Sequence, residues 1–396
     1  VWTDTEQGTL MTTHNGQWQN ISNHPYFKWT GNDGAGSGIQ CYSARLYENP
    51  YQDPGTTSTQ QGNYEVSPSI PSQTVWYLRG RMKDNVGTWS EPMTLFTLKY
   101  DKTPPHNPTS CIAYSEKGST TTIPNDQWQN IDRDPYFEWS GATDTTESKV
   151  GSGVDGYSFC WSENPDKDPG TDSITSNTYY QVPSPVGSQA TYYLRVRTKD
   201  NVGNWSEPKT LFTFRYNISG LPAPEKLTAN EANPSKWQYS PTFTINWTNP
   251  QSDVGIKGAW YKLGEKPSYG TDGTFITQKP FSITADREGS QTLSLWLEDN
   301  LGNKDHNLSS TVILRYDQTP PQNPATCTAY LSSGTIATIP DKTWQNIDAD
   351  LYFVWDIPND TAGSHTGSGI SAYSIAWKQS PDGDPGTGSI QTIPNY

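Results

Sequence analysis

The sequence predicts an all-β protein made of a series of small β-sandwich domains. The main observation is a stretch that alternates apolar and polar residues and then enters an Asp-Asn-x-Gly turn. It occurs at 76–92 and 192–208 and, more loosely, at 292–307, and we call it the signature stretch. Such alternation is typical of a strand with one buried face, and the turn residues favour a tight reversal into a second strand. The spacing indicates one copy in each complete domain.

The composition is the second observation, and it fits small sandwiches with aromatic cores. Only 32% of the residues are hydrophobic, but there are 16 Trp and 23 Tyr, together with 33 Gly and 31 Pro. Small domains have a high ratio of surface to volume, so a few large aromatic side chains must supply much of each core.

Each unit presents its elements in the same order. An aromatic strand comes first, as YFKW at 26–29 and YFEW at 136–139, with Phe and Trp two residues apart and therefore on one face. A glycine-rich loop and a second strand follow, and then a DPGT turn at 53–56, 168–171 and 384–387. Pro followed by Gly suits a type II turn. The signature stretch and a closing strand, TLFTLKY or TLFTFRY, complete the unit.

The register of these elements predicts four domains, at 1–105, 106–218, 219–321 and 322–396. Adjacent prolines in the connectors DKTPPHNP (101–108) and DQTPPQNP (317–324) favour extended polyproline geometry, so we expect the domains to form an extended rod. The third domain is shorter and divergent.

The fourth domain repeats 106–180 and is incomplete. It matches the second domain without a gap up to Tyr396, at an offset of 216 residues, and stops before its signature stretch. Half a sandwich leaves apolar faces and strand edges in water. Either the sequence is a window of a longer repeat protein, or a neighbouring chain supplies the missing strands.

The aromatic strands and the Tyr-x-Leu-x-Val-x-Thr strand at 192–198 resemble those of fibronectin type III and related immunoglobulin-like domains. The aromatic pairs are Phe27 and Trp29, Phe137 and Trp139, Ile245 and Trp247, and Phe353 and Trp355. The resemblance covers nearly the whole chain and implies about seven strands in two sheets with Greek-key connections. The linkers and turns are similar to repeats of bacterial or archaeal secreted surface proteins.

Alternation along the signature stretch predicts structural cation–π pairs on its outer face. If Leu194 and Val196 point inward, the arginines beside them point outward, and the return strand brings a tryptophan next to them. Such a contact is worth ~0.5–1 kcal/mol at an exposed site. In the third domain the two residue types are exchanged. The predicted pairs involve Arg79, Arg81, Trp89, Arg195, Arg197, Trp205, Trp296 and Lys304.

Catalysis has no support in the sequence, and we expect no enzyme. Nucleophile-elbow, zinc-protease, P-loop and dinucleotide-binding motifs are absent from their required contexts. The five histidines are scattered over different units, which argues against a histidine-rich metal site.

Calcium is the best small ligand that the sequence suggests, since Asp166, Asp168 and Asp172 surround one DPGT turn. Oxygen ligands at short spacing suit Ca²⁺, although an aspartate-rich turn without an ion explains the pattern equally simply. No other cofactor is indicated. Trp161, Trp260 and Trp377 follow the glycine loops at similar places and are candidate glycan contacts, with core packing as the alternative.

Modification sites depend on where the protein resides. Sequons for N-glycosylation occur at Asn20, Asn204, Asn217, Asn246, Asn307 and Asn359, and they matter only in an exported protein. For Cys111 and Cys160, a bridge within one domain and buried free thiols are the two options.

These features together predict a structural repeat region of an extracellular surface protein, fibre or appendage. It would act as a stiff spacer and self-associate into a polymer or surface array. The alternative is an adhesin stalk, or carbohydrate-binding accessory modules of a larger secreted enzyme. The net charge of −14 argues against nucleic acid or an anionic membrane as a partner. No apolar run reaches the ~20 residues of a membrane-spanning helix.

Overall fold

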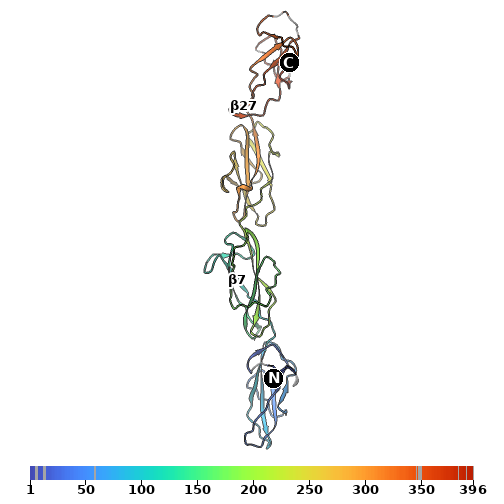
Figure 1. Cartoon of the computed structure of the whole chain (residues 1–396), viewed down its shortest axis with the longest axis vertical. Coiled ribbons are helices and arrows are strands. Elements are labelled where there is room, and N and C mark those ends of the chain that lie inside the picture. The colour runs from blue at the N-terminus through green and yellow to red at the C-terminus, as the bar shows by residue number, and fades with distance from the viewer. Residues whose placement is uncertain are drawn as a thin grey trace. The chain divides into compact units, whose positions relative to one another are not determined.

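The computed structural model describes residues 1–4, 8–11, 15–57, 59–344, 346, 350–381, 383–388 and 390–395. Figure 1 shows strands in every coloured stretch of the chain. Apart from one 3₁₀ turn, η1 (His306–Leu308), the elements of these residues are all strands. The predicted all-β fold is confirmed. No helix within the described ranges has the length and hydropathy to cross a membrane.

The second sandwich shows the plan of the fold most completely. One sheet has the order β14-β10-β7-β8, made of Tyr179–Gln181, Tyr136–Ser140, Ser110–Tyr114 and Thr122–Ile123. The facing sheet has the order β13-β15-β16-β9, made of Val154–Ser162, Gln189–Asp200, Lys209–Asn217 and Trp128–Gln129. The chain crosses from one sheet to the other between β10 and β13, between β13 and β14, and between β14 and β15. This is the strand order of an immunoglobulin-like or fibronectin type III-like sandwich.

The signature stretch forms the central hairpin of the larger sheet, as predicted. β15 pairs antiparallel with both β13 and β16, and Leu194 and Val196 are fully buried. They pack into a core that contains Phe137, whose ring centroid lies 5.2 Å from those of Trp161 and Phe212. The sandwich is therefore held by aromatic side chains contributed by both sheets.

The first and third sandwiches follow the same plan. In the first, β1-β6-β5-β3 faces β2-β4; in the third, β20-β19-β22-β23 faces β17-β18-β21. The first-sandwich strands β1 to β6 are Trp18–Gln19, Tyr26–Lys28, Ile39–Tyr47, Asn63–Glu65, Thr74–Asp84 and Met93–Tyr100. The third-sandwich strands β17 to β23 are Glu225–Ala229, Thr242–Thr248, Ile256–Leu263, Thr274–Ile276, Phe281–Thr284, Gly289–Asp299 and Ser310–Tyr316.

Each of these three sandwiches encloses its own hydrophobic cluster. By its contacts, the chain divides into two compact halves, Val1–Ile218 and Ser219–Tyr396. The first and second sandwiches lie in the N-terminal half, and the third sandwich and the fourth unit lie in the C-terminal half.

The fourth unit keeps one sheet, β25-β24-β26, made of Thr338–Ile339, Cys327–Tyr330 and Tyr352–Trp355. Small hairpins accompany it, formed by β27 (Thr361–Ala362) with β28 (His365–Thr366) and by β29 (Tyr373–Ser374) with β30 (Ile390–Gln391). Trp344 is fully exposed, and Trp377 is 72% exposed. The corresponding rings of the second sandwich, Trp128 and Trp161, contact Arg215 of β16 and Tyr192 of β15, whose counterparts would lie beyond residue 396.

The four cysteines are all free thiols, so Cys111 and Cys160 do not form a bridge. Burial raises the pKa of the Cys111 thiol to about 12, because the thiolate loses its hydration inside the sandwich. Cys327, at the same repeat position in the fourth unit, is exposed.

We expect iodoacetamide at pH 8 to alkylate Cys327 at least about tenfold faster than Cys111, since the thiolate is the reactive form and must also be accessible. Peptide mass spectrometry over a time course measures both rates in one sample. In urea the two rates should converge. Equal rates in the folded protein would contradict the buried position of Cys111.

Candidate metal centre

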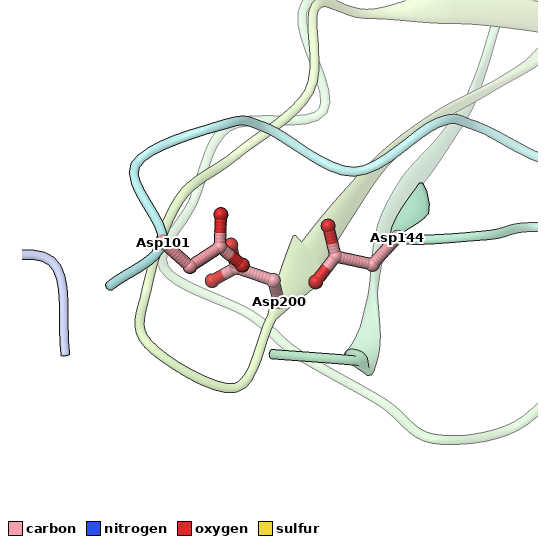
Figure 2. A group of neighbouring side chains, drawn as sticks. All are labelled: Asp101, Asp144 and Asp200. Atoms are coloured by element: carbon pink, nitrogen blue, oxygen red, sulfur yellow. The ribbon is translucent and has the colours of Figure 1, made fainter. Parts of the chain in front are cut away.

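Three aspartates from distant parts of the sequence meet at the junction of the first and second sandwiches. Asp101 follows β6 at the start of the linker, Asp144 precedes β11 (Thr145–Thr146), and Asp200 ends β15. One carboxylate oxygen from each lies within 4.8 Å of the other two (Figure 2). The side chains are shielded from solvent, with exposed fractions of 0%, 4% and 0%. Among the described residues, this is the one group of three acidic, histidine or cysteine side chains with such spacing.

Asp200 is placed by the Asp-Asn-x-Gly turn. Its Oδ1 accepts hydrogen bonds from the backbone N–H groups of Val202 and Asn204, at 3.0 and 2.8 Å. Asp84 and Asp299 make equivalent bonds in the first and third sandwiches. The local role of this aspartate is therefore to close a turn, because its side chain satisfies backbone donors that the reversal leaves open.

Asp144 is held by the loop that follows it and by the first sandwich. Its Oδ2 accepts from Gly153 N at 2.7 Å and from Ser152 Oγ at 3.3 Å. Its Oδ1 accepts from Gln73 Nε2 at 3.2 Å, which makes a direct contact between the two sandwiches.

Asp101 accepts from Ser152 N at 2.7 Å through Oδ2 and from Thr103 N at 3.1 Å through Oδ1. The loop can approach this closely only because residue 151 is glycine. A Cβ there would lie 2.6 Å from Asp101 Oδ2 and from both carboxylate oxygens of Asp144. The backbone thus wraps directly around the carboxylates.

The electrostatics of the cluster are unfavourable as it stands. Every donor just named is a neutral N–H or O–H group, and no ion pair in the described part of the chain joins a lysine or arginine to these aspartates. Burial raises the pKa values of Asp144 and Asp200, and the charge of Asp101 raises them further. Two unit charges ~4 Å apart repel by about 4 kcal/mol at an effective dielectric constant of 20.

A related arrangement occurs in the C-terminal half, 216 residues along the sequence. Asp317 Oδ2 accepts from Ser368 N, and Asp360 Oδ2 accepts from Gly369 N, both at 2.6 Å. Both Oδ2 atoms lie within 2.9 Å of the position that a Cβ on Gly367 would take. The Oδ1 atoms of Asp317 and Asp360 are buried and have no hydrogen-bond partner among the described residues.

The three aspartates that the sequence suggested for calcium do not form such a cluster. Asp166 and Asp172 are exposed, and the Asp168 carboxylate receives two hydrogen bonds from Arg197, at 2.7 and 2.5 Å. Arg197 lowers the pKa of Asp168 through these bonds. Asp53 and Arg81 form the same ion pair in the first sandwich, so this turn aspartate fixes an arginine of the signature strand.

The structure corrects the partners of the predicted cation–π pairs. Trp205 forms an antiparallel bridge with Lys199, whose Nζ lies 5.9 Å from the ring centroid, and Trp89 has the same relation to Lys83. The return strand therefore places each tryptophan beside a lysine near the end of the signature strand. The arginines bond elsewhere: Arg79 to Thr94, Arg195 to the Lys167 carbonyl, and Arg81 and Arg197 to the turn aspartates.

In the third sandwich the ring beside Lys304 is Trp260, at 5.6 Å, rather than Trp296. Trp296 is fully buried, donates to the Gly270 carbonyl at 2.8 Å, and stacks on Trp260 with a centroid distance of 6.4 Å. Glu298 connects the group by accepting from Lys304, Lys257 and the Trp260 indole. The exchange of residue types in this domain thus reflects a different, carboxylate-centred network.

The candidate glycan contacts and sequons occupy varied positions. Trp161 stacks on Tyr192 at 5.0 Å, Trp260 stacks on Trp296, and Trp377 is mostly exposed. The amide nitrogens of Asn20, Asn204 and Asn307 donate hydrogen bonds, and Asn217 is buried. Asn246 and Asn359 are exposed. A glycan on Asn20 or Asn204 would have to break the sandwich junction.

No protein family model matches the chain, and no curated protein matches it. Among solved structures, the fibronectin(III)-like modules of Clostridium thermocellum CbhA are 15% identical, with a TM-score of 0.23, over 53% of this chain and 98% of that one. The FN1–FN3 domains of chicken CNTN1 are 9% identical, with a TM-score of 0.23, over 76% of this chain and 97% of that one. The fold assignment rests on the strand order described above.

Proposed function

We propose that the chain is a structural repeat region of an extracellular surface protein, fibre or appendage of a bacterium or archaeon. Its sandwiches serve as a stiff spacer and as a self-association element, and they carry out no catalysis. The observation that carries the spacer role is the number of hydrogen bonds across the junction of the first two sandwiches.

Three separate segments around the end of the first sandwich take part in that junction. Asn20 donates to the Val202 carbonyl at 2.7 Å, Gln73 donates to Asp144, and Asp101 accepts from Ser152. Contacts at three points resist bending in every direction, whereas a single flexible linker would resist none.

The Pro-Pro linker is also fixed to the second sandwich. Asn107 Oδ1 accepts from Thr198 Oγ1 at 2.9 Å and from Ser206 Oγ at 2.7 Å, and its Nδ2 donates to the Glu207 carbonyl at 2.6 Å. Lys209 Nζ donates to the Pro108 carbonyl at 2.8 Å. A linker anchored in this way adds little freedom between the domains that it joins.

Self-association is supported by the apolar surface of the fourth unit. Ile336 is 98% exposed, and Trp344 and Trp377 are exposed beside it in sequence and function as uncovered core positions of the repeat. Contiguous apolar surface of this kind marks interaction sites in soluble proteins. The glycan-binding alternative is less well supported, because two of its three tryptophans stack on aromatic neighbours within their own sandwiches.

The test combines small-angle scattering with sedimentation velocity on the full chain. We expect one persistent extended form at low concentration and concentration-dependent association, and a double variant N20A/Q73A should broaden the range of scattering profiles. A matched control, Asn246→Ala, changes an exposed amide away from the junction and should behave as wild type. A wild-type chain that needs a broad ensemble of domain orientations would overturn the spacer role. Monomers at every concentration would overturn the self-association role.

A further inference from the structure

We propose that Asp101, Asp144 and Asp200 form a binding site for a divalent cation, with Ca²⁺ as the preferred ion. The site lies at the junction of the first two sandwiches, apart from the turn at 166–172 that the sequence suggested. Cation binding is a property of these side chains and holds or fails independently of the spacer function.

The first step of the argument is charge. Three carboxylates lie within 4.8 Å of one another and are at least nine-tenths buried, with neutral hydrogen-bond donors only. Buried charges in proteins are paired or coordinate metals, because the cost of removing an ion from water is otherwise uncompensated. A divalent cation at the centre would convert the mutual repulsion of the carboxylates into attraction.

The second step is independent of the first cluster and comes from its repeat in the C-terminal half. Asp360 is nine-tenths buried, and its Oδ1 has no hydrogen-bond partner among the described residues. Asp317 Oδ1 is buried and unpartnered as well, and both carboxylates converge on Gly367. An unsatisfied buried acceptor is costly. Two such oxygens at the positions of Asp101 and Asp144 indicate a missing positive partner.

The third step selects the ion. All available ligands are hard oxygen atoms, which suit Ca²⁺ and Mg²⁺ better than softer metals. Mg²⁺ demands near-ideal octahedral geometry and keeps several water molecules, whereas Ca²⁺ accepts irregular oxygen cages with several carboxylates. A buried cluster of three carboxylates closed by the backbone at Gly151 therefore favours Ca²⁺.

The consequence of binding follows from where the ligands are attached. Asp101 belongs to the linker, and Asp144 and Asp200 belong to two loops of the second sandwich. Asp144 contacts Gln73, and Asn204 contacts both Asp200 and Asn20, so residues of the first sandwich touch the cluster on two sides. Ion binding should therefore stabilise the junction more than it stabilises either core.

The test is calorimetric titration of the full chain, freed of metal by chelation, with CaCl₂ and separately with MgCl₂. We expect Ca²⁺ to bind at least about tenfold more tightly than Mg²⁺. Asp144→Asn, which keeps the side-chain shape, should weaken Ca²⁺ binding at least about tenfold, since affinity follows the number of ligand charges. The matched control Asp168→Asn removes a carboxylate of the same sandwich that is paired with Arg197, and should leave this binding unchanged.

A second readout guards against a variant that fails to fold. Hydrogen exchange of peptides covering 101–108, 141–153 and 198–206 should slow on addition of Ca²⁺ to the wild type, and core peptides should change less. Asp360→Asn should remove any weaker second binding event and leave the first intact. Absence of Ca²⁺ binding to the wild type, or undiminished binding to a folded Asp144→Asn variant, would overturn the proposal and leave protons as the neutralising species. Scattering with and without Ca²⁺ tests the spacer role separately.

Discussion

Replacing Phe137 with Ala should destabilise the second sandwich by about 3–5 kcal/mol. Phe137 has no exposed surface and lies between Trp161 of one strand and Phe212 of another, each 5.2 Å away between ring centroids. The cavity left by the ring has rigid aromatic walls on both sheets, so the surrounding side chains cannot collapse into it fully.

Hydrogen exchange resolved by peptide is the suitable measurement, because unfolding of a multi-domain chain is not a single two-state transition. Protection of β10 and β15 should fall roughly a hundredfold or more, and protection of the third sandwich should stay unchanged. The control Ile112→Ala alters a side chain that is 43% exposed on the neighbouring strand of the same sheet, and we expect a much smaller loss. An equal loss in the third sandwich would show that the cores are not independent.

Acidification should destabilise the third sandwich through Glu298. Burial by itself would raise the pKa of this carboxyl, but hydrogen bonds from Lys257, Lys304 and the Trp260 indole outweigh it and lower the pKa to about 2. Because the folded pKa lies below the unfolded value of 4.5, the stabilisation is fully present above about pH 4.5. It is lost as the pH falls toward 2. With allowance for solvent screening at Lys257, the loss is about 1–3 kcal/mol.

The matched variant Glu298→Gln isolates this effect from the titration of other carboxylates. It removes the charge but nearly keeps the volume, so it should be less stable than wild type at pH 5 and approach wild type near pH 2. The readout is the urea concentration at which β22 peptides lose protection in pulsed hydrogen exchange, with β15 peptides as an internal reference. The same dependence on pH in both proteins would rule out Glu298 as the source.

The sequence predicted well those features that depend on neighbouring residues. Alternation along 192–198 correctly assigned Leu194 and Val196 to the core, because a strand turns successive side chains to opposite faces. The Asp-Asn-x-Gly turn and the repeated aromatic strands predicted the hairpin and the all-β fold in the same way.

Partner assignments were less reliable where two strands or a strand and a loop had to be aligned. Trp205 pairs with Lys199 instead of an arginine, since the register across a hairpin depends on the turn and on a bulge at Leu194/Arg195. Arg197 binds Asp168, 29 residues earlier, and this pairing also occupies the carboxylate that the sequence suggested for calcium.

The sequence by itself determined an array of aromatic-cored β-sandwiches, their repeat of 216 residues, and the aspartates that close their turns. Only the tertiary structure decided that Asp101, Asp144 and Asp200 share one buried site. The sequence did contain a signal, since aspartates recur at 317 and 360 and a glycine recurs at 367 in place of 151. That signal gives no distance, because a linker, a loop and a turn come together only when two sheets pack and carry their connections to the same end of the sandwich.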